Sequence, residues 1–268
     1  MFKRTLGGGY GCVALLAALG WALPAWGVNL ITAVTVTNGD GPISGGVDTQ
    51  RENDLDGTIV YFNEDVFSFT DRTHEYNGAR YDSGTGLLST SGDTIVPLPS
   101  YLVGGEYIAT RNSNRDNPVG FQIDVTVSRD VWAYLLIDNR LGDSTSSNPP
   151  TLGSGGVGLM AWVADDGWTQ YSTGLFPNNQ PDYVGVDEGG SVSNWAARTH
   201  LATTGPGNGL NQFSTVYRKR FTGPGIITLK EQAGGNLNMY GLVVTPEPAT
   251  MGLLVLGAAG LAARRRRH

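Results

Sequence analysis

The residues that could carry acid, base or nucleophilic chemistry are sparse in this chain. Two histidines stand in its interior, His74 and His200, far apart and without the spacing of a metal site. No His-Glu-x-x-His, Gly-x-Ser-x-Gly or phosphate-loop pattern occurs. Three adjacent acidic pairs could serve a glycosidase if the fold held two carboxylates about 5–9.5 Å apart. These pairs are Glu64-Asp65, Asp165-Asp166 and Asp187-Glu188. Adjacency alone is weak support, so we expect a protein that is not an enzyme, with a polysaccharide hydrolase or lyase as an alternative.

One acidic segment begins like a calcium loop. Glu52, Asp54 and Asp56 place side-chain oxygens at alternate positions before Gly57. The twelfth position is Asn63, whereas an EF-hand requires a bidentate glutamate there, and no helical pattern flanks the segment. The alternative is a turn rich in Asn and Asp. We therefore expect no cofactor, and Asp54 and Asp56 are the candidate ligands if calcium binds.

Other polar and aromatic residues have the chemistry of sugar binding. Aromatic faces stack on the C–H surfaces of sugar rings, and planar polar groups hydrogen-bond the hydroxyls. The candidates follow expected strands or lie near an expected loop: Arg111, Asn112, Asp138, Arg140, Trp168 and Tyr171. Those that follow strands could meet at one end of a β-sandwich. For Asp138 and Arg140, the alternative is a structural ion pair.

Charge and cysteine content exclude several classes of function. Eighteen Lys and Arg residues stand against 24 Asp and Glu residues, and six of the eighteen lie in the two terminal segments. The interior is therefore strongly acidic, which argues against binding nucleic acid. The only cysteine is Cys12, so the rest of the chain has no disulfide, thiolate metal site or thiol nucleophile.

Short strand-like runs between turn-forming residues make up the interior. The predicted strands are Leu30–Thr37, Thr58–Phe62, Val66–Phe69, Thr94–Leu98, Glu106–Thr110, Val119–Val127, Val131–Asp138, Val157–Ala164, Phe213–Phe221, Gly225–Lys230 and Met239–Thr245. Residues 121–127 alternate apolar and polar, residues 131–137 are apolar throughout, and the turn between them predicts a hairpin. Ser193–Thr203 is a candidate short helix, while Asp143–Gly156 and Gly174–Gly190 read as loops. This pattern predicts an all-β fold, a single antiparallel β-sandwich of the jelly-roll kind.

The two ends of the chain differ from this interior. A basic start, an apolar run of residues 12–23 and small residues at Ala25 and Gly27 predict a signal peptide, residues 1–27, cleaved after Gly27. Near the other end, residues 249–263 are uncharged and would form a helix about 22 Å long. That length is marginal for crossing a membrane unless the flanking arginines extend it. A signal helix and a transmembrane-like helix are thus expected to flank the sandwich.

The C-terminal segment resembles a known sorting signal. Pro246, Glu247 and Pro248 precede the apolar segment, and Arg264, Arg265, Arg266 and Arg267 follow it. This order of parts resembles the PEP-CTERM sorting domain, here residues 246–268. The resemblance implies recognition by an exosortase, a membrane transpeptidase-like enzyme, and a place at the cell surface or in an extracellular polysaccharide matrix. A permanent membrane anchor is the alternative.

A looser resemblance covers roughly 180 residues of the interior. Residues 66–71, 101–111, 121–140, 167–168, 217–221 and 238–240 are similar to the galactose-binding-like sandwich modules of secreted polysaccharide lyases. The resemblance implies a β-sandwich that binds carbohydrate, with extracellular polysaccharide as a partner. Because residues 38–56 are too polar to form a second core, we expect one non-catalytic domain over residues 28–245. A purely structural or protein-interacting matrix component is the alternative.

Overall fold

The fold is built almost entirely from antiparallel strands. A computed structural model describes residues 29–41, 61–116, 119–194, 198–202, 205–233 and 237–247. The strands are β1 Ile31–Thr37, β2 Val66–Phe67, β3 Glu75–Asn77, β4 Ala79–Tyr81, β5 Thr94–Val96, β6 Glu106–Ile108, β7 Gln122–Val127, β8 Val131–Asp138, β9 Thr169–Gln170, β10 Tyr183–Asp187, β11 Gln212–Phe221, β12 Gly225–Lys230 and β13 Gly241–Pro246. The helical elements are short: η1 Asn112–Asp116, α1 Ala161–Asp165 and η2 Pro177–Asn179.

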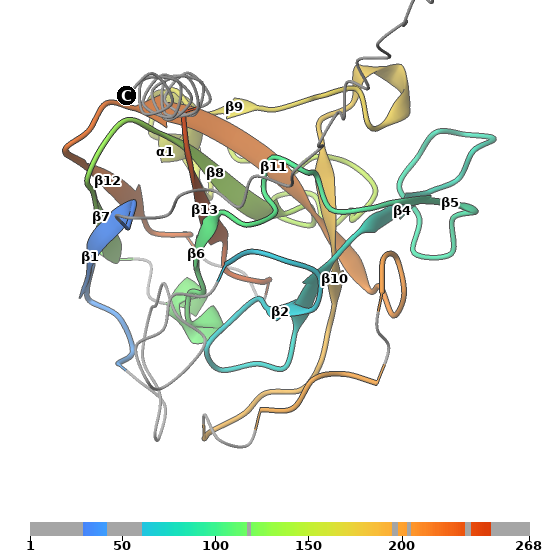
Figure 1. Cartoon of the computed structure of the whole chain (residues 1–268), viewed down its shortest axis with the longest axis horizontal. Coiled ribbons are helices and arrows are strands. Elements are labelled where there is room, and N and C mark those ends of the chain that lie inside the picture. The colour runs from blue at the N-terminus through green and yellow to red at the C-terminus, as the bar shows by residue number, and fades with distance from the viewer. Residues whose placement is uncertain are drawn as a thin grey trace, which may run out of the picture.

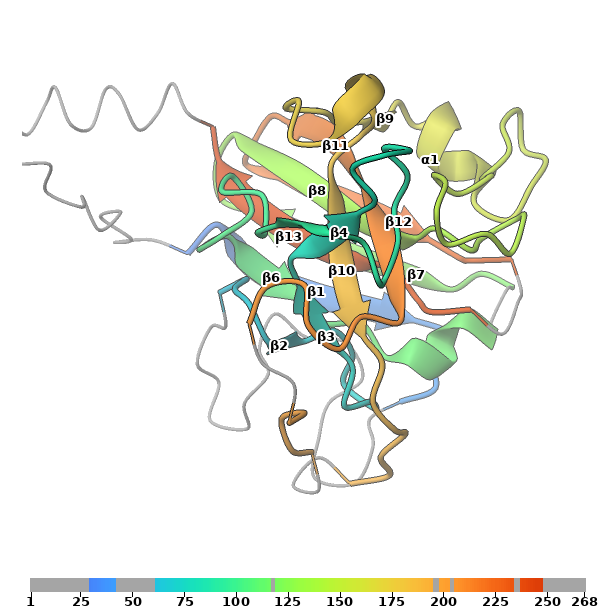
Figure 2. The same cartoon turned by 90° about the vertical axis from the view of Figure 1, so that its right-hand side faces the viewer.

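Two sheets form the body, as Figures 1 and 2 show from two sides. The smaller sheet has the order β1-β7-β12, and the larger has the order β2-β3-β10-β11-β8-β13-β6, with β9 added beside β11. A separate hairpin joins β4 to β5. Every pairing between these strands is antiparallel. This arrangement is consistent with the predicted all-β sandwich.

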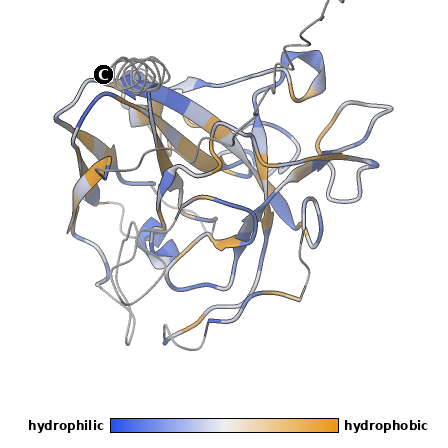
Figure 3. Ribbon diagram, in the orientation of Figure 1, coloured by the Kyte–Doolittle hydropathy of each residue, from blue (hydrophilic) through white to orange (hydrophobic). Residues whose placement is uncertain are grey.

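The main core lies between the two sheets and explains the contrast between β7 and β8. In β7, only Ile123, Val125 and Val127 are buried, because the other face of the small sheet is partly open. In β8, one face contributes Leu135 and the alternate residues on either side of it to this core, while the other face packs beneath the loops that cover the large sheet. A strand buried on both faces has no position for polar alternation, so its sequence is apolar throughout. In Figure 3 the central strands are accordingly more hydrophobic than the loops.

Two further hydrophobic clusters complete the body. On the outer face of the large sheet, Leu136 and Val243 pack under loop residues Phe62 and Leu102. The third cluster surrounds the β4–β5 hairpin, where Ala79 and Val96 meet a set of residues from the segments beside it. These are Leu88, Phe176, Tyr183, Leu210 and Phe213. The loops that join the large sheet are thus anchored by apolar side chains, which fixes the positions of the polar residues at the strand ends.

Several sequence predictions differ from the structure. β7 and β8 do not form a hairpin, because β7 pairs with β1 and β12 while β8 pairs with β11 and β13. Residues 128–130 instead carry the chain from one sheet to the other, so that both strands face the same core. The expected strand Val157–Ala164 is a turn followed by α1. β10 lies within the segment expected to be a loop, and the described part of 193–203 contains no helix.

Some predictions concern residues outside the described part of the chain. These are the signal peptide, the calcium candidates Asp54 and Asp56, and the tail from Pro248 onward with its arginines. Within the described ranges, no helix is long and apolar enough to cross a membrane. The same ranges contain no group of three or more His, Cys, Asp or Glu side chains arranged to hold a metal ion.

Candidate functional site

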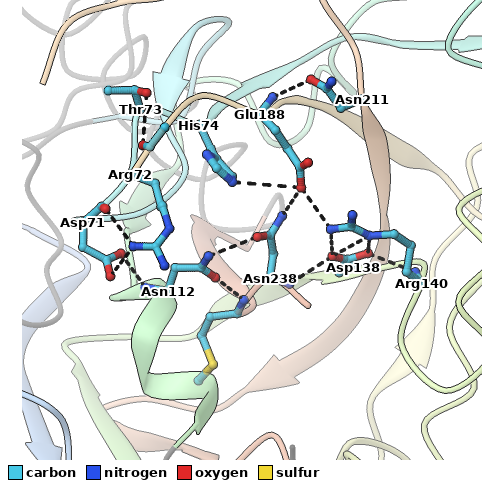
Figure 4. Close-up of polar contacts among 12 residues, drawn as sticks. Asp71, Arg72, Thr73, His74, Asn112, Asp138, Arg140, Glu188, Asn211 and Asn238 are labelled. Carbon is cyan, nitrogen blue, oxygen red and sulfur yellow. Dashed lines mark hydrogen bonds and ion pairs between the residues drawn. The ribbon is translucent and has the colours of Figure 1, made fainter. Parts of the chain in front are cut away.

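Polar side chains gather at one end of the large sheet, where β8 and β10 end and β3, β11 and β13 begin. We call this set the polar cluster, and Figure 4 labels all of its members but Arg111. It consists of Asp71, Arg72, His74, Arg111, Asn112, Asp138, Arg140, Glu188, Asn211 and Asn238. The antiparallel register explains why these side chains lie close together. Asp138 of β8 lies opposite Ser214 of β11, and Asp187 of β10 lies opposite Glu75 of β3. Residues adjacent to these strand ends must therefore lie close together.

Asp138 and Arg140 form the centre of the polar cluster. The Arg140 guanidinium donates to both carboxylate oxygens of Asp138, with Nε–Oδ1 at 3.1 Å and Nη2–Oδ2 at 2.7 Å. The Arg140 backbone N–H also donates to Asp138, as does that of Asn238. The Asp138 side chain is fully buried, whereas 27% of the Arg140 side chain is exposed. The structural ion pair considered from the sequence is therefore present.

Glu188 connects this pair to the other side of the polar cluster. Its Oε1 accepts from Arg140 Nη2 and from Asn238 Nδ2, each at 3.0 Å. The Glu188 backbone N–H donates to Asn211 Oδ1 at 2.8 Å. Like Arg140, Glu188 keeps 27% of its side chain exposed. Arg140 and Glu188 are thus the charged side chains at the centre of the cluster that are partly exposed to solvent.

The electrostatics of the polar cluster are nearly balanced. Burial alone would lower the pKa of Arg140, but the hydrogen bonds and charges of Asp138 and Glu188 outweigh that effect and raise it. His74 lies with Nε2 4.0 Å from Glu188 Oε1, too far for a hydrogen bond. Burial lowers the pKa of His74 to about 4, although Glu188 opposes the shift. His74 is therefore neutral at pH 7.

Asn112 and Asp71 hold the adjoining loop in place. Asn112 donates from Nδ2 to Asn238 Oδ1 at 3.1 Å and accepts at Oδ1 from the Met239 N–H at 2.7 Å. Its own N–H donates to Asp71 Oδ1 at 2.8 Å. Arg111 lies beside the same carboxylate, with Nε 3.7 Å from Asp71 Oδ2, and its Nη1 donates to the carbonyl oxygen of Gly41. Bonds to backbone groups give this part of the cluster a positioning role.

The structure thus brings together four of the six sugar-binding candidates and separates two. Arg111, Asn112, Asp138 and Arg140 belong to the polar cluster. Trp168 lies in the core between the sheets, 4% exposed, with its ring 5.6 Å from that of Phe221. Tyr171 packs on the outer face of the large sheet, where the Arg218 guanidinium lies 3.7 Å from its ring centre.

Six members of the polar cluster were not among those candidates: Asp71, Arg72, His74, Glu188, Asn211 and Asn238. Glu188 and Asn238 contact partners that are far from them in sequence, so no local spacing marks them. Glu188 could have been found through its place in an acidic pair, and Asn238 through the Asn-Met-Tyr run that ends at Tyr240. Their membership of the polar cluster can be recognised only once the strand register is known.

A small pocket beside α1 is the second place where polar groups meet. It has a volume of about 260 Å³, and Trp162, Asp165, Asp166 and Lys230 are among the residues that line it. Both Asp165 oxygens accept backbone N–H groups, from Gly155 at 2.7 Å and from the following residue at 2.8 Å. These bonds lower the pKa of Asp165.

The contacts of Asp165 do not suit the general acid of a glycosidase. A general acid must hold a proton near neutral pH, and the lowered pKa of Asp165 favours the opposite state. Asp166 forms an ion pair with Lys230 at 2.9 Å. This adjacent pair therefore has the bonding of structural carboxylates.

Comparisons with known proteins add one finding to this all-β body with a polar cluster at one end. Residues 244–267 match the PEP-CTERM protein-sorting motif. The chain therefore carries a PEP-CTERM tail, the mark of an exported surface protein that an exosortase processes at the membrane. No curated protein matches the chain, and no solved structure matches it. The galactose-binding-like resemblance is thus not confirmed.

Proposed function

We propose that this exported protein binds extracellular polysaccharide without catalysis, through the exposed side of its polar cluster. The observation that carries the proposal is the Arg140–Glu188 pair, which is partly exposed while Asp138 and Asn238 hold it from beneath. A guanidinium fork offers donors in fixed directions, and a carboxylate offers acceptors, which together match neighbouring hydroxyls of a sugar ring. Groups already held in place lose little conformational entropy when a ligand binds.

The proposal includes the finer features of fold and location. The two antiparallel sheets, with a polar cluster at one end, suit the jelly-roll or galactose-binding-like kind of sandwich. Before processing, the apolar residues 249–263 would hold the chain in the membrane, with the body on the outer side. After processing, the body would belong to the cell surface or to the polysaccharide matrix of a biofilm.

Retention on insoluble polysaccharides tests this function. We expect the purified body to be retained by at least one member of a broad glycan panel. Glu188→Ala and Arg140→Lys should weaken retention by roughly 10- to 100-fold, since hydrogen bonds to charged groups contribute about 1.5–3 kcal/mol. Asp130→Ala is the matched control, because Asp130 is also a partly exposed acid paired with an arginine, but at the other end of β8.

The control should bind as wild type does, and thermal unfolding should show that each variant is folded. Absence of retention across the whole panel would contradict glycan binding, as would a folded Glu188→Ala variant that binds normally. One observation favours the alternative of a purely structural or protein-interacting component: the polar groups of the cluster mostly bond one another. That alternative predicts no retention on glycans and recovery of a protein partner by crosslinking at the cell surface.

A further inference from the structure

The sorting motif begins inside the folded body. The matched residues start at Val244, whereas β13 continues to Pro246. Residues 244–246 are paired with residues 131–133 of β8 in the antiparallel register. The first proline of the Pro-Glu-Pro motif is therefore the last residue of a strand, and no linker separates the sheet from the motif.

A side-chain contact also holds the residue after the strand. Glu247 Oε2 accepts from Arg220 Nη2 at 2.8 Å, and the same nitrogen contacts Asp130 Oδ2 at 3.2 Å. Arg220 lies near the end of β11, opposite Trp132 of β8. The glutamate of the motif is thus attached to the same end of the sheet from which β13 leaves.

We propose that the end of β13 is a latch that controls access to the sorting motif. The latch comprises Thr245, Pro246 and Glu247, together with their partners on β8 and β11. A processing enzyme must take the substrate backbone into its own active site, and backbone that is paired in a sheet becomes available only when it opens locally. The exosortase would therefore act on a chain whose β13 end has separated from β8.

The structure makes such opening feasible without unfolding the body. β6 pairs with β13 only at residues 242–244, so Thr245 and Pro246 have a strand neighbour on one side alone. Proline has no backbone N–H to donate, which weakens the last position of the ladder. Arg220 keeps 48% of its side chain exposed, so its ion pair with Glu247 is a surface contact that breaks readily.

A reducible crosslink at the latch provides the direct test. Thr245 lies opposite Trp132, and the body contains no cysteine, so Thr245→Cys with Trp132→Cys would introduce a single disulfide. The full-length chain, with Cys12→Ser so that the two introduced cysteines are its only ones, is incubated with membranes that contain the exosortase, and mass spectrometry follows loss of the residues up to His268. Thr126→Cys with Ile226→Cys is the control crosslink, since this pair joins β7 to β12 in the other sheet.

We expect the oxidised latch variant to remain unprocessed and to be processed once it is reduced, which also shows that it is folded. The control disulfide should have no effect. A four-residue Gly-Ser insertion between Thr245 and Pro246 should speed processing, and Arg220→Ala should speed it by no more than about fivefold, given the small strength of exposed ion pairs. Equal rates for the oxidised and reduced latch, an insertion without effect, or a wild-type chain that keeps its terminus would each overturn the inference. These outcomes do not depend on glycan binding.

Discussion

At the scale of single residues, the polar cluster combines a buried charge with a buried neutral base. The Asp138 carboxylate is stable in the interior because Arg140 pairs with it and backbone groups satisfy it. His74 lies nearby with no hydrogen bond to its buried Nδ1, and burial keeps its ring uncharged at neutral pH by lowering its pKa.

His74 should make folding sensitive to mild acid. Its pKa is about 4 when folded, against 6.5 in the unfolded chain, so between these values only the unfolded imidazole takes up a proton. The contribution of neutral His74 to the free energy of unfolding is thus complete above pH 6.5. It decreases by on the order of 3 kcal/mol as the pH drops toward 4. His74→Gln should lose less of its free energy of unfolding than wild type. Urea unfolding of both proteins at pH 7 and pH 4.5 measures this, and equal losses would contradict the assignment.

At the scale of elements, the two faces of one strand provide a sharp comparison. In β12, Ile227 is fully buried in the core between the sheets, while its neighbour Ile226 is 59% exposed. Ile227→Ala should lower the free energy of unfolding by about 2–5 kcal/mol, because it leaves a cavity. Ile226→Ala, with the same chemical change, should alter it by no more than about 0.5 kcal/mol. Denaturant unfolding distinguishes them, and similar losses at both positions would mean that the register of β12 is wrong.

At this scale, the elements with the clearest sequence patterns were the ones that the sequence predicted correctly. β8 and β12 were predicted to the residue, because both combine strand-forming residues with clear turns at each end. β10 was missed because its five residues include a glycine and lie between Pro181 and Gly189, which read as a loop. The sequence of α1 predicts a strand, because a short apolar run fits either structure. The prediction of a β7–β8 hairpin was wrong, because local sequence does not determine which sheet a strand joins.

The polar cluster was predictable only in part, for a related reason. Asp138 and Arg140 bond each other across two residues, so their place after a strand was enough to suggest a shared site. Glu188 and Asn238 reach them from 48 and 100 residues away in sequence. Such contacts depend on the order of strands in the sheet, and that order was not evident from composition or spacing.

At the scale of the whole molecule, β8 and β13 separate the polar cluster from the sorting motif. The polar cluster lies where β8 ends and β13 begins, and the sorting motif starts where β13 ends beside Val131. Eight residues of β8 place these regions about 24 Å apart at roughly 3.4 Å per residue. If the tail holds the body at the membrane, as proposed above, this separation would place the polar cluster on the side away from the membrane.

This orientation predicts a difference in chemical access along the body. Thr222 is an exposed residue beside the motif end of the sheet, and Asp143 is an exposed residue in the loop after Asp138. Because the body has no cysteine, Thr222→Cys and Asp143→Cys each introduce one thiol. In the unprocessed chain held by its tail, a bulky membrane-impermeant maleimide should label position 222 several-fold more slowly than position 143, since the bilayer obstructs the near side. The two rates should become similar once the tail is removed, which controls for local reactivity. Equal rates in the anchored chain would show that the motif end does not face the membrane.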